Sequence, residues 1–324
     1  MSLSDTPTLL DRLRARPRLR SALAAALPVG FVTALLFVPY ALLLVHSFWR
    51  LRNGTITHEF TLENYGRLFG TELYPSTILF SAGIALRVTL LSLLLAYPLA
   101  YLLAFKVKRY KHLMYMAVII PLWVSYLVRA YAWKIILGQE GILNGLLASM
   151  GLIHEPLTFL LYSWWAVILA LTHIYTPFTL MPIYAVLEAI PRGLKEASQD
   201  LYAGRWQTFL RIILPLSLPG VLAGSTFAFV LSMGDFLAPQ LLGGNDSALM
   251  VSNLVWSLFG VAYNWPLGAA VSVVVLLLTL FLLWLANRVE SAMNYGGQAD
   301  GRTGGRSVAV PGAGTAVEIG STGR

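Results

Sequence analysis

Long apolar runs between short charged segments constrain the fold of this chain most strongly. Six runs reach the length of about 20 residues that a helix needs to cross about 30 Å of hydrocarbon. Lipid offers no hydrogen-bond partners, so each run must satisfy its own backbone as a helix. Of the 324 residues, 57% are hydrophobic and 12% are charged, far from the composition of a soluble domain. We therefore predict an all-α polytopic membrane protein with six transmembrane helices.

The apolar runs divide the chain into three parts. Residues 1–27 form a basic N-terminal segment, residues 28–290 form the transmembrane domain, and residues 291–324 form a Gly-rich tail that we expect to be disordered. The first run is longer than the apolar core of a signal peptide, so we expect it to be retained as a span. The predicted spans cover residues 28–49, 77–105, 112–137, 160–190, 214–242 and 266–287.

Lys and Arg residues are distributed unevenly between alternate loops. Seventeen lie in the N-terminal segment, the loops after the second and fourth spans, and the tail, whereas the loops on the other side hold Arg50, Arg52 and Arg67. Loops rich in Lys and Arg remain in the cytoplasm. We therefore expect both termini to be cytoplasmic. The net charge of +8 is then an orientation signal and does not indicate a nucleic-acid surface.

Residues 191–213 form the one mixed polar and apolar segment between long apolar runs, and we call them the coupling segment. Pro191 suits the first turn of a helix, and apolar residues then recur at helical spacing. The pattern breaks at Ala203-Gly204, and a second apolar stripe leads to Pro215 and Pro219, where we expect a bend into the fifth span. The residues of the two stripes are Leu194, Ala197 and Leu201, then Trp206, Phe209, Leu210 and Ile213.

These patterns predict a helix-turn-helix that is exposed to water and continuous with the fourth and fifth spans. From the residues alone, an amphipathic connector lying on the lipid surface is an equally good interpretation, because basic amphipathic helices are common at membranes.

The coupling segment resembles the EAA motif of permease subunits in binding-protein-dependent ABC importers. Glu196-Ala197-Ser198 stands where the family has Glu-Ala-Ala, and Ile212-x-Leu214-Pro215 ends the motif in register. Tyr202 occupies the position of the family's usual glycine, with Gly204 two residues later. In that family the segment docks into a cleft on an ATPase subunit. The resemblance assigns this role to Glu196, Ala197, Ser198, Asp200, Ala203, Gly204, Leu214 and Pro215.

Further stretches are similar to the spermidine/putrescine branch of this family, and they extend from the first span to the last. The stretches are Leu62-Glu63-Asn64-Tyr65, Pro121-Leu122-Trp123, Arg129-Ala130-Tyr131-Ala132-Trp133, Gly141-Ile142-Leu143-Asn144, Gly234-Asp235-Phe236-Leu237-Ala238-Pro239 and Leu241-Leu242-Gly243-Gly244. The resemblance implies a bacterial inner-membrane subunit that forms half of a pathway for a polyamine such as spermidine or putrescine.

The same resemblance implies the partners of the chain. They are a second permease subunit, two ATPase subunits that bind ATP and magnesium, and a periplasmic substrate-binding protein. The loops 138–159 and 243–264 contain no Lys or Arg and are the expected docking surface for the binding protein. An opine, another amine or ferric iron remains an alternative solute, and a self-sufficient secondary transporter remains an alternative class, although no clear internal repeat is present.

One carboxylate falls inside a predicted span. Asp235 lies in the fifth, where a charge costs several kcal/mol unless it faces a cavity or a partner. We expect it either to contact a cationic substrate or to have a packing or subunit-interface role, bonded to a helix of the second permease. Aromatic rings attract cations, and Trp123, Tyr126 and Tyr175 are candidates for lining the same pathway.

The sequence gives no indication of an enzyme. It has no cysteine and no GxxxxGK[ST] phosphate loop, and its five His residues are scattered. We therefore expect no catalytic residue, no metal site and no cofactor in this chain.

Overall fold

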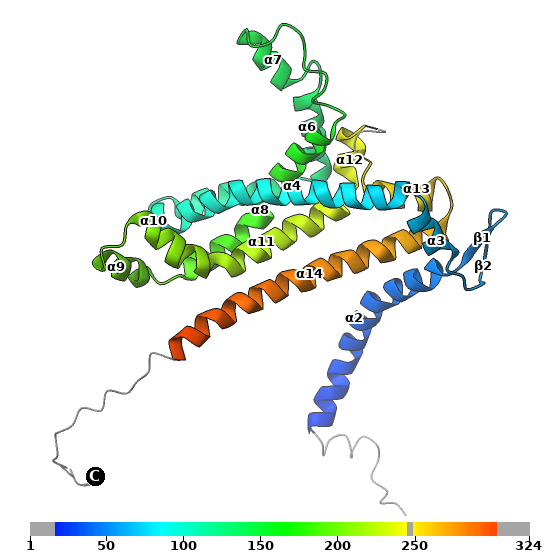
Figure 1. Ribbon diagram of the computed structural model, residues 1–324, viewed down its shortest axis with the longest axis horizontal. Helices are drawn as coiled ribbons and strands as arrows, with labels where there is room; N and C mark the ends of the chain where they lie inside the picture. Colours follow the sequence, from blue (N-terminus) through cyan, green and yellow to red (C-terminus); the bar gives the residue numbers. More distant parts are fainter. Residues whose placement is uncertain (1–16, 245–248, 303–324) are drawn as a thin grey trace, which may run out of the picture.

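The computed structural model describes residues 17–244 and 249–302, and this part of the chain is mainly helical (Figure 1). Its elements are α2 Pro17–Ser47, β1 Arg50–Arg52, β2 Thr55–Thr57, α3 Glu63–Gly70, α4 Leu73–Tyr101, η1 Leu102–Lys106, α5 Lys111–Ile119, η2 Ile120–Trp123, α6 Tyr126–Leu137, α7 Ile142–Ser149, α8 Trp164–Ala189, α9 Arg192–Asp200, α10 Arg205–Thr208, η3 Phe209–Ile213, α11 Leu214–Gly234, α12 Leu237–Leu242, α13 Val251–Gly260 and α14 Trp265–Arg302. The elements η1 and η3 are π-helical turns, and η2 is a 3-10 turn.

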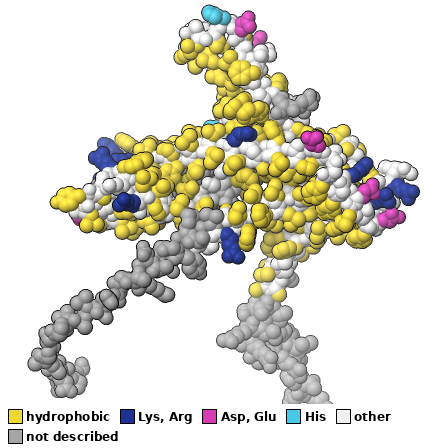
Figure 2. Space-filling model, in the orientation of Figure 1, with side chains coloured by type: hydrophobic (Ala, Val, Ile, Leu, Met, Phe, Trp, Pro, Cys, Tyr) yellow, Lys and Arg dark blue, Asp and Glu magenta, His cyan; other side chains and the backbone are white. Residues whose placement is uncertain are grey.

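Three long helices, α4, α8 and α11, form the centre of the bundle and pack most extensively on one another. The hairpin β1–β2 and α3 lie at one end, and α9 and α10 lie at the other (Figure 1). We call these the hairpin end and the coupling end. Hydrophobic side chains cover most of the long sides of the bundle, whereas most charged side chains gather toward its ends (Figure 2). This distribution is that of a protein whose long sides face hydrocarbon.

Five helices of the described chain are long and apolar enough to cross a membrane. They lie at Pro28–Ser47, Leu73–Lys106, Trp164–Ala189, Arg205–Gly234 and Trp265–Arg288, close to five of the six predicted spans. A sixth is possible only if the bent pair Lys111–Trp123 and Tyr126–Ser149 counts as one span. The membrane-spanning helical fold is therefore as predicted, with five or six spans.

The third predicted span, residues 112–137, is not a continuous helix. The helix pair bends by 93° between Trp123 and Tyr126. Pro121 has no backbone N–H, so the chain tightens into the 3-10 turn η2, and Val124 and Ser125 follow in extended conformation. As a result α6 and α7 project away from the central bundle (Figure 1).

The fifth predicted span, residues 214–242, also differs. Its helix begins earlier, at Arg205, and stops at Gly234, and Asp235 is extended. The Asp235 carboxylate then accepts a hydrogen bond at 3.0 Å from the N–H of Ala238, in the first turn of the short helix α12. The last helix, α14, continues to Arg302 and so covers the beginning of the segment 291–324 that composition predicts to be disordered.

The hairpin end is fixed by the first residues of α3. Asn64 is buried, and its amide donates to the carbonyls of Ser47 and Trp49, both at 2.8 Å. The Tyr65 and Ser47 hydroxyls are 2.8 Å apart, and Glu63 pairs with Arg50 at 2.8 Å. The stretch 62–65 thus attaches α3 to the end of α2 and gives this loop a defined fold.

Two glycines allow α8 and α11 to approach closely. Gly220 and Gly224 are four residues apart on one face of α11, the small-xxx-small spacing of closely packed membrane helices. A Cβ at position 224 would lie 2.5 Å from the Thr179 carbonyl oxygen, and one at position 220 would lie 2.8 Å from the Pro182 carbonyl oxygen. Backbone atoms cannot turn aside as a flexible side chain can, so the contact requires glycine.

Gly224→Ala is therefore expected to destabilise the bundle by about 1–3 kcal/mol, since α8 and α11 must move apart. Thermal unfolding of the purified chain measures the effect as a lower midpoint. The matched control is Gly234→Ala at the end of the same helix, where a Cβ would have no neighbour within 4 Å. Equal midpoints for the two variants would contradict the close contact.

Candidate functional site

The coupling segment folds as a short helix, a turn and a second helix that leads into α11. α9 covers Arg192–Asp200, and the chain from Arg205 to Gly234 continues through α10, η3 and α11. The helix-turn-helix is as the sequence predicts, but no break follows at Pro215. Instead the helix widens into the π-helical turn η3 just before Pro215. Pro215 has no backbone N–H to donate, and the wider turn adapts the helix to this missing hydrogen bond.

The turn between the two helices is made by Tyr202. This residue has a φ of 57°, in the left-handed region, whereas Gly204 has an ordinary φ of −63° at the start of α10. Although Gly204 is the nearest glycine, it does not supply the left-handed residue of the turn. The tyrosine stands at the position where the family has glycine, and the left-handed conformation costs a non-glycine residue about 1–2 kcal/mol.

Large apolar side chains are exposed around this turn. Leu201, Tyr202 and Trp206 are 82%, 98% and 70% exposed, and we call these three residues the apolar tip. Leu194 and Ala197, which share the first predicted stripe, are also exposed, so that stripe does not pack inside the chain. Glu196 and Asp200 lie exposed on the same helix. An exposed apolar cluster with charged neighbours is typical of a surface that binds a protein partner.

The coupling segment is joined to the membrane helices through specific contacts. Ser198 is buried, and its hydroxyl lies 2.9 Å from that of Thr208, which connects α9 to α10. Phe209 makes edge-to-face contacts with Tyr97 and Tyr101 of α4, each with ring centroids 5.9 Å apart. The Tyr97 hydroxyl is 2.9 Å from that of Ser217, so α4 is also joined to α11.

Thr208, Tyr97 and Ser217 are not among the predicted site residues. The signal in the sequence is weak, because it consists of single polar atoms inside apolar runs. Around them Leu103, Leu180, Leu187 and Ile213 form a buried cluster contributed by η1, α8 and η3. The contacts of α9 thus lead through Thr208 to a packed core.

Asp235 is the centre of a second set of contacts. It is 7% exposed, and one carboxylate oxygen accepts hydrogen bonds from the hydroxyls of Tyr126 and Tyr175, the latter at 2.5 Å. The other oxygen accepts the Ala238 N–H, and the Asp235 carbonyl accepts the Ser252 hydroxyl at 2.5 Å. We call Asp235, Tyr126 and Tyr175 the tyrosine–aspartate cluster. It joins α6, α8 and α12 at the point where α11 ends.

The structure thus brings together three of the four residues predicted for the pathway. Trp123 is not part of the cluster, because it lies at the bend before α6 and is 82% exposed. The hydrogen bonds to the Asp235 carboxylate named above all come from neutral donors within the chain, and they satisfy the hydrogen-bonding capacity of this buried group. Among the described residues, no group of three His, Asp or Glu is placed to hold a metal ion.

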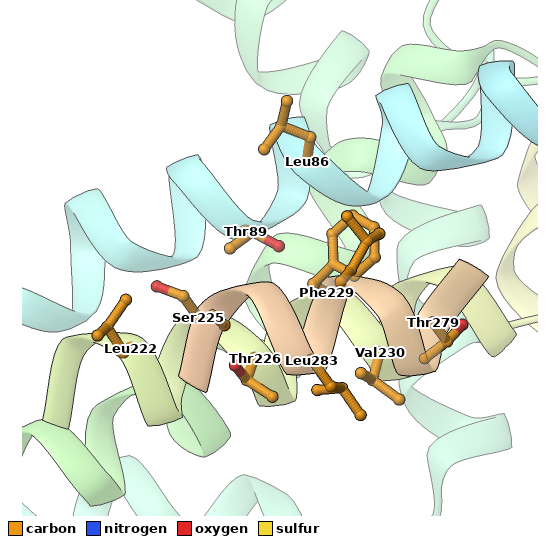
Figure 3. Close-up of a pocket in the computed structure, with 11 residues that line it drawn as sticks. Leu86, Thr89, Leu222, Ser225, Thr226, Phe229, Val230, Thr279 and Leu283 are labelled. Atoms are coloured by element: carbon orange, nitrogen blue, oxygen red, sulfur yellow. The ribbon is translucent and has the colours of Figure 1, made fainter. Parts of the chain in front are cut away.

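A groove of about 230 Å³ lies between α4, α11 and α14 (Figure 3). Apolar side chains from the three helices line it, among them Leu86, Phe229 and Leu283. Its polar atoms are hydroxyls, and that of Thr89 already donates to the Ala85 carbonyl at 2.7 Å. The groove has no charged side chain, so it has the character of a surface for lipid or another apolar helix and not of a site for a cation.

These features define a multi-pass membrane protein with a polar helical segment at one end of its bundle. Residues 92–295 match the family described as "Binding-protein-dependent transport system inner membrane component". The chain is 35% identical over 274 residues to the "Spermidine/putrescine transport system permease protein PotB" of Haemophilus influenzae, which covers 84% of this chain and 94% of the relative. It is 36% identical over 265 residues to the protein of the same name in Escherichia coli, covering 81% and 95%.

A solved structure, "Crystal structure of bacterial alginate ABC transporter in complex with alginate pentasaccharide-bound periplasmic protein", shares the fold with a TM-score of 0.65 at 20% identity, over 86% of this chain and 96% of that one. This chain belongs to the family of inner membrane components of binding-protein-dependent transport systems. It is a multi-pass permease of the inner membrane, as its resemblance to the family predicts.

Proposed function

We propose that this chain forms half of the translocation pathway of an ATP-driven importer for a polyamine such as spermidine or putrescine. The observation that carries the solute class is the match to two permeases that are named for spermidine and putrescine transport, over more than four fifths of this chain and more than nine tenths of each relative. The match includes both the spans and the coupling segment. A permease contributes no reaction chemistry, so ATP and magnesium are bound in partner subunits.

The coupling segment is the contact with an ATPase subunit. The apolar tip supplies exposed surface that a protein cleft can bury, and Glu196 and Asp200 add charge beside it. The contacts of Ser198, Phe209 and Tyr97 then pass a displacement of α9 to α4 and α11. Closure of the ATPase on ATP would move these helices together and change the side of the membrane to which the pathway opens.

The remaining partners follow from the same arrangement. A second permease completes the pathway, two ATPase subunits bind at the coupling end, and a periplasmic protein delivers the solute at the hairpin end. The imbalance of Lys and Arg supports cytoplasmic termini and a cytoplasmic coupling end. The projecting helices α6 and α7 carry exposed apolar residues such as Leu146 and Met150, which suits contact with another subunit.

The role of Asp235 in the pathway remains part of this proposal. A carboxylate near the end of α11 suits a cationic solute, and two tyrosine rings beside it suit cation–π contact. In the arrangement seen here the carboxylate is engaged by two hydroxyls and a backbone N–H. A cation would therefore have to displace a tyrosine hydroxyl from the carboxylate. Direct contact between Asp235 and the solute thus belongs to a different conformation of the transport cycle.

The experiment that tests the function is reconstitution of the chain with its native partners, followed by measurement of ATP hydrolysis with a panel of solutes. We expect spermidine or putrescine to stimulate hydrolysis and ATP-dependent uptake. Stimulation by an opine, another amine or ferric iron, but not by polyamines, would overturn the solute assignment. Uptake that proceeds without ATP would overturn the importer class in favour of a secondary transporter.

A further inference from the structure

A basic cavity lies at the coupling end, where the loop after η1 and the start of α5 meet the end of α8. It has a volume of about 530 Å³, within the range of small-molecule sites. Lys108, Arg109, Lys111 and His112 line it from the loop and α5, and Glu188 is its acidic residue. We propose that this cavity binds the phosphate headgroup of an anionic phospholipid.

The charge of the cavity fits a phosphate. Lys111 is engaged by Glu188, with the ammonium nitrogen and the carboxylate oxygen 2.6 Å apart. This pair leaves the positive charges of Lys108 and Arg109, both exposed at the rim, for a ligand. Cationic side chains near a membrane surface each contribute about 1 kcal/mol to the attraction of an anionic headgroup. Two of them on one rim favour an anionic lipid over a zwitterionic one.

The opposite wall is rigid and aromatic. Tyr115 of α5 and Tyr184 of α8 are stacked, with ring centroids 4.6 Å apart, and the Lys111 ammonium lies 5.4 Å from the Tyr184 ring centre. These contacts hold α5 against α8, so the cavity is formed before a ligand arrives. Preformed walls reduce the entropy that binding costs.

The surface beside the cavity indicates that the ligand carries acyl chains. No residue of α5 is buried. Leu113, Ala117 and Ile120 recur at helical spacing along α5 and η2, and all three are exposed. Tyr110, 56% exposed at the rim, is an aromatic residue of the kind found at the membrane interface. Basic headgroup contacts followed by an apolar track fit a phospholipid, whereas free phosphate needs no such track.

The test is cross-linking of the full-length chain, in zwitterionic nanodiscs, by a photoactivatable phosphatidylglycerol, with the site mapped by mass spectrometry. We expect cross-links within residues 108–120 that unlabelled phosphatidylglycerol removes and phosphatidylcholine does not. Lys108→Gln with Arg109→Gln should reduce labelling about 25-fold, or about fivefold for each charge removed. Arg109→Lys keeps the charge and should retain most of the labelling, which separates loss of binding from misfolding.

The chain offers a matched control. Arg288 also stacks on an exposed neighbouring ring, 5.3 Å from Trp284, much as Arg109 lies 5.4 Å from Tyr110. Arg288→Gln should leave labelling at residues 108–120 unchanged. If it reduced labelling as much as the double variant does, the labelling would reflect general charge attraction, and the proposed lipid site would be overturned. Complete displacement by millimolar inorganic phosphate would assign the cavity to free phosphate. Unchanged labelling in the double variant, with loss of ATPase association, would assign it to a protein contact.

Discussion

Asp235→Ala is expected to lower the thermal stability of the chain strongly and to abolish uptake. The substitution removes the common acceptor of two tyrosine hydroxyls and of the Ala238 N–H. Each buried donor left without a partner costs about 1–3 kcal/mol. Because the three donors belong to α6, α8 and α12, the junction at the end of α11 should loosen. Thermal unfolding of the purified chain and uptake into proteoliposomes measure the two effects.

Single tyrosine variants separate the contributions to this cluster. Tyr126→Phe and Tyr175→Phe each remove one donor while the carboxylate keeps the others, so each should lower the midpoint less than Asp235→Ala does. Glu140→Ala removes an exposed carboxylate and serves as the control. A midpoint for Asp235→Ala equal to that of the control would contradict a structural role for the cluster. If uptake of a dication still fell in that case, Asp235 would act on the solute alone.

The sequence predicts the helices of this protein better than their breaks. Apolar length alone identifies four of the spans within a few residues, and the fifth apart from its two ends, because lipid forces each apolar run into a helix. The break near Pro121 occurs inside an apolar stretch, and the break after Gly234 coincides with Asp235, a single charge in an otherwise apolar run that does not by itself indicate the end of a helix. Hydropathy carries no signal there, and a proline only raises the chance of a kink.

In the candidate site, too, the sequence predicts the helical segments better than the local geometry and the contacts between helices. The pattern of residues 191–213 predicts the helix, turn and second helix that the structure shows there, but it does not reveal that Tyr202 takes the left-handed turn. The intramembrane position of Asp235 identifies it as unusual, but the sequence does not reveal that the hydroxyls of Tyr126 and Tyr175 donate to its carboxylate. Their place in a solute pathway stays a prediction. Residues such as Thr208 and Tyr97 could not be singled out, because their role depends on which helices lie side by side.

Leu201→Asp should uncouple transport while leaving the chain inserted in the membrane. Leu201 is 82% exposed in the apolar tip, so the substitution removes no buried contact within the chain. A cleft that receives this side chain would have to bury a charge instead, and loss of a central apolar contact commonly costs about 2 kcal/mol, or about 30-fold in affinity. Co-purification with the ATPase subunits and ATP-dependent uptake measure the loss.

Glu196→Lys tests the charged part of the same surface and should also weaken association with the ATPase. Glu59→Lys is the matched control, because it reverses an exposed carboxylate in the segment between β2 and α3. These two elements lie at the opposite end of the bundle from α9 (Figure 1). It should leave association unchanged. If Leu201→Asp and Glu196→Lys both retained ATPase binding and uptake, the coupling segment would be a surface connector, and its contacts with α4 and α11 would serve the fold alone.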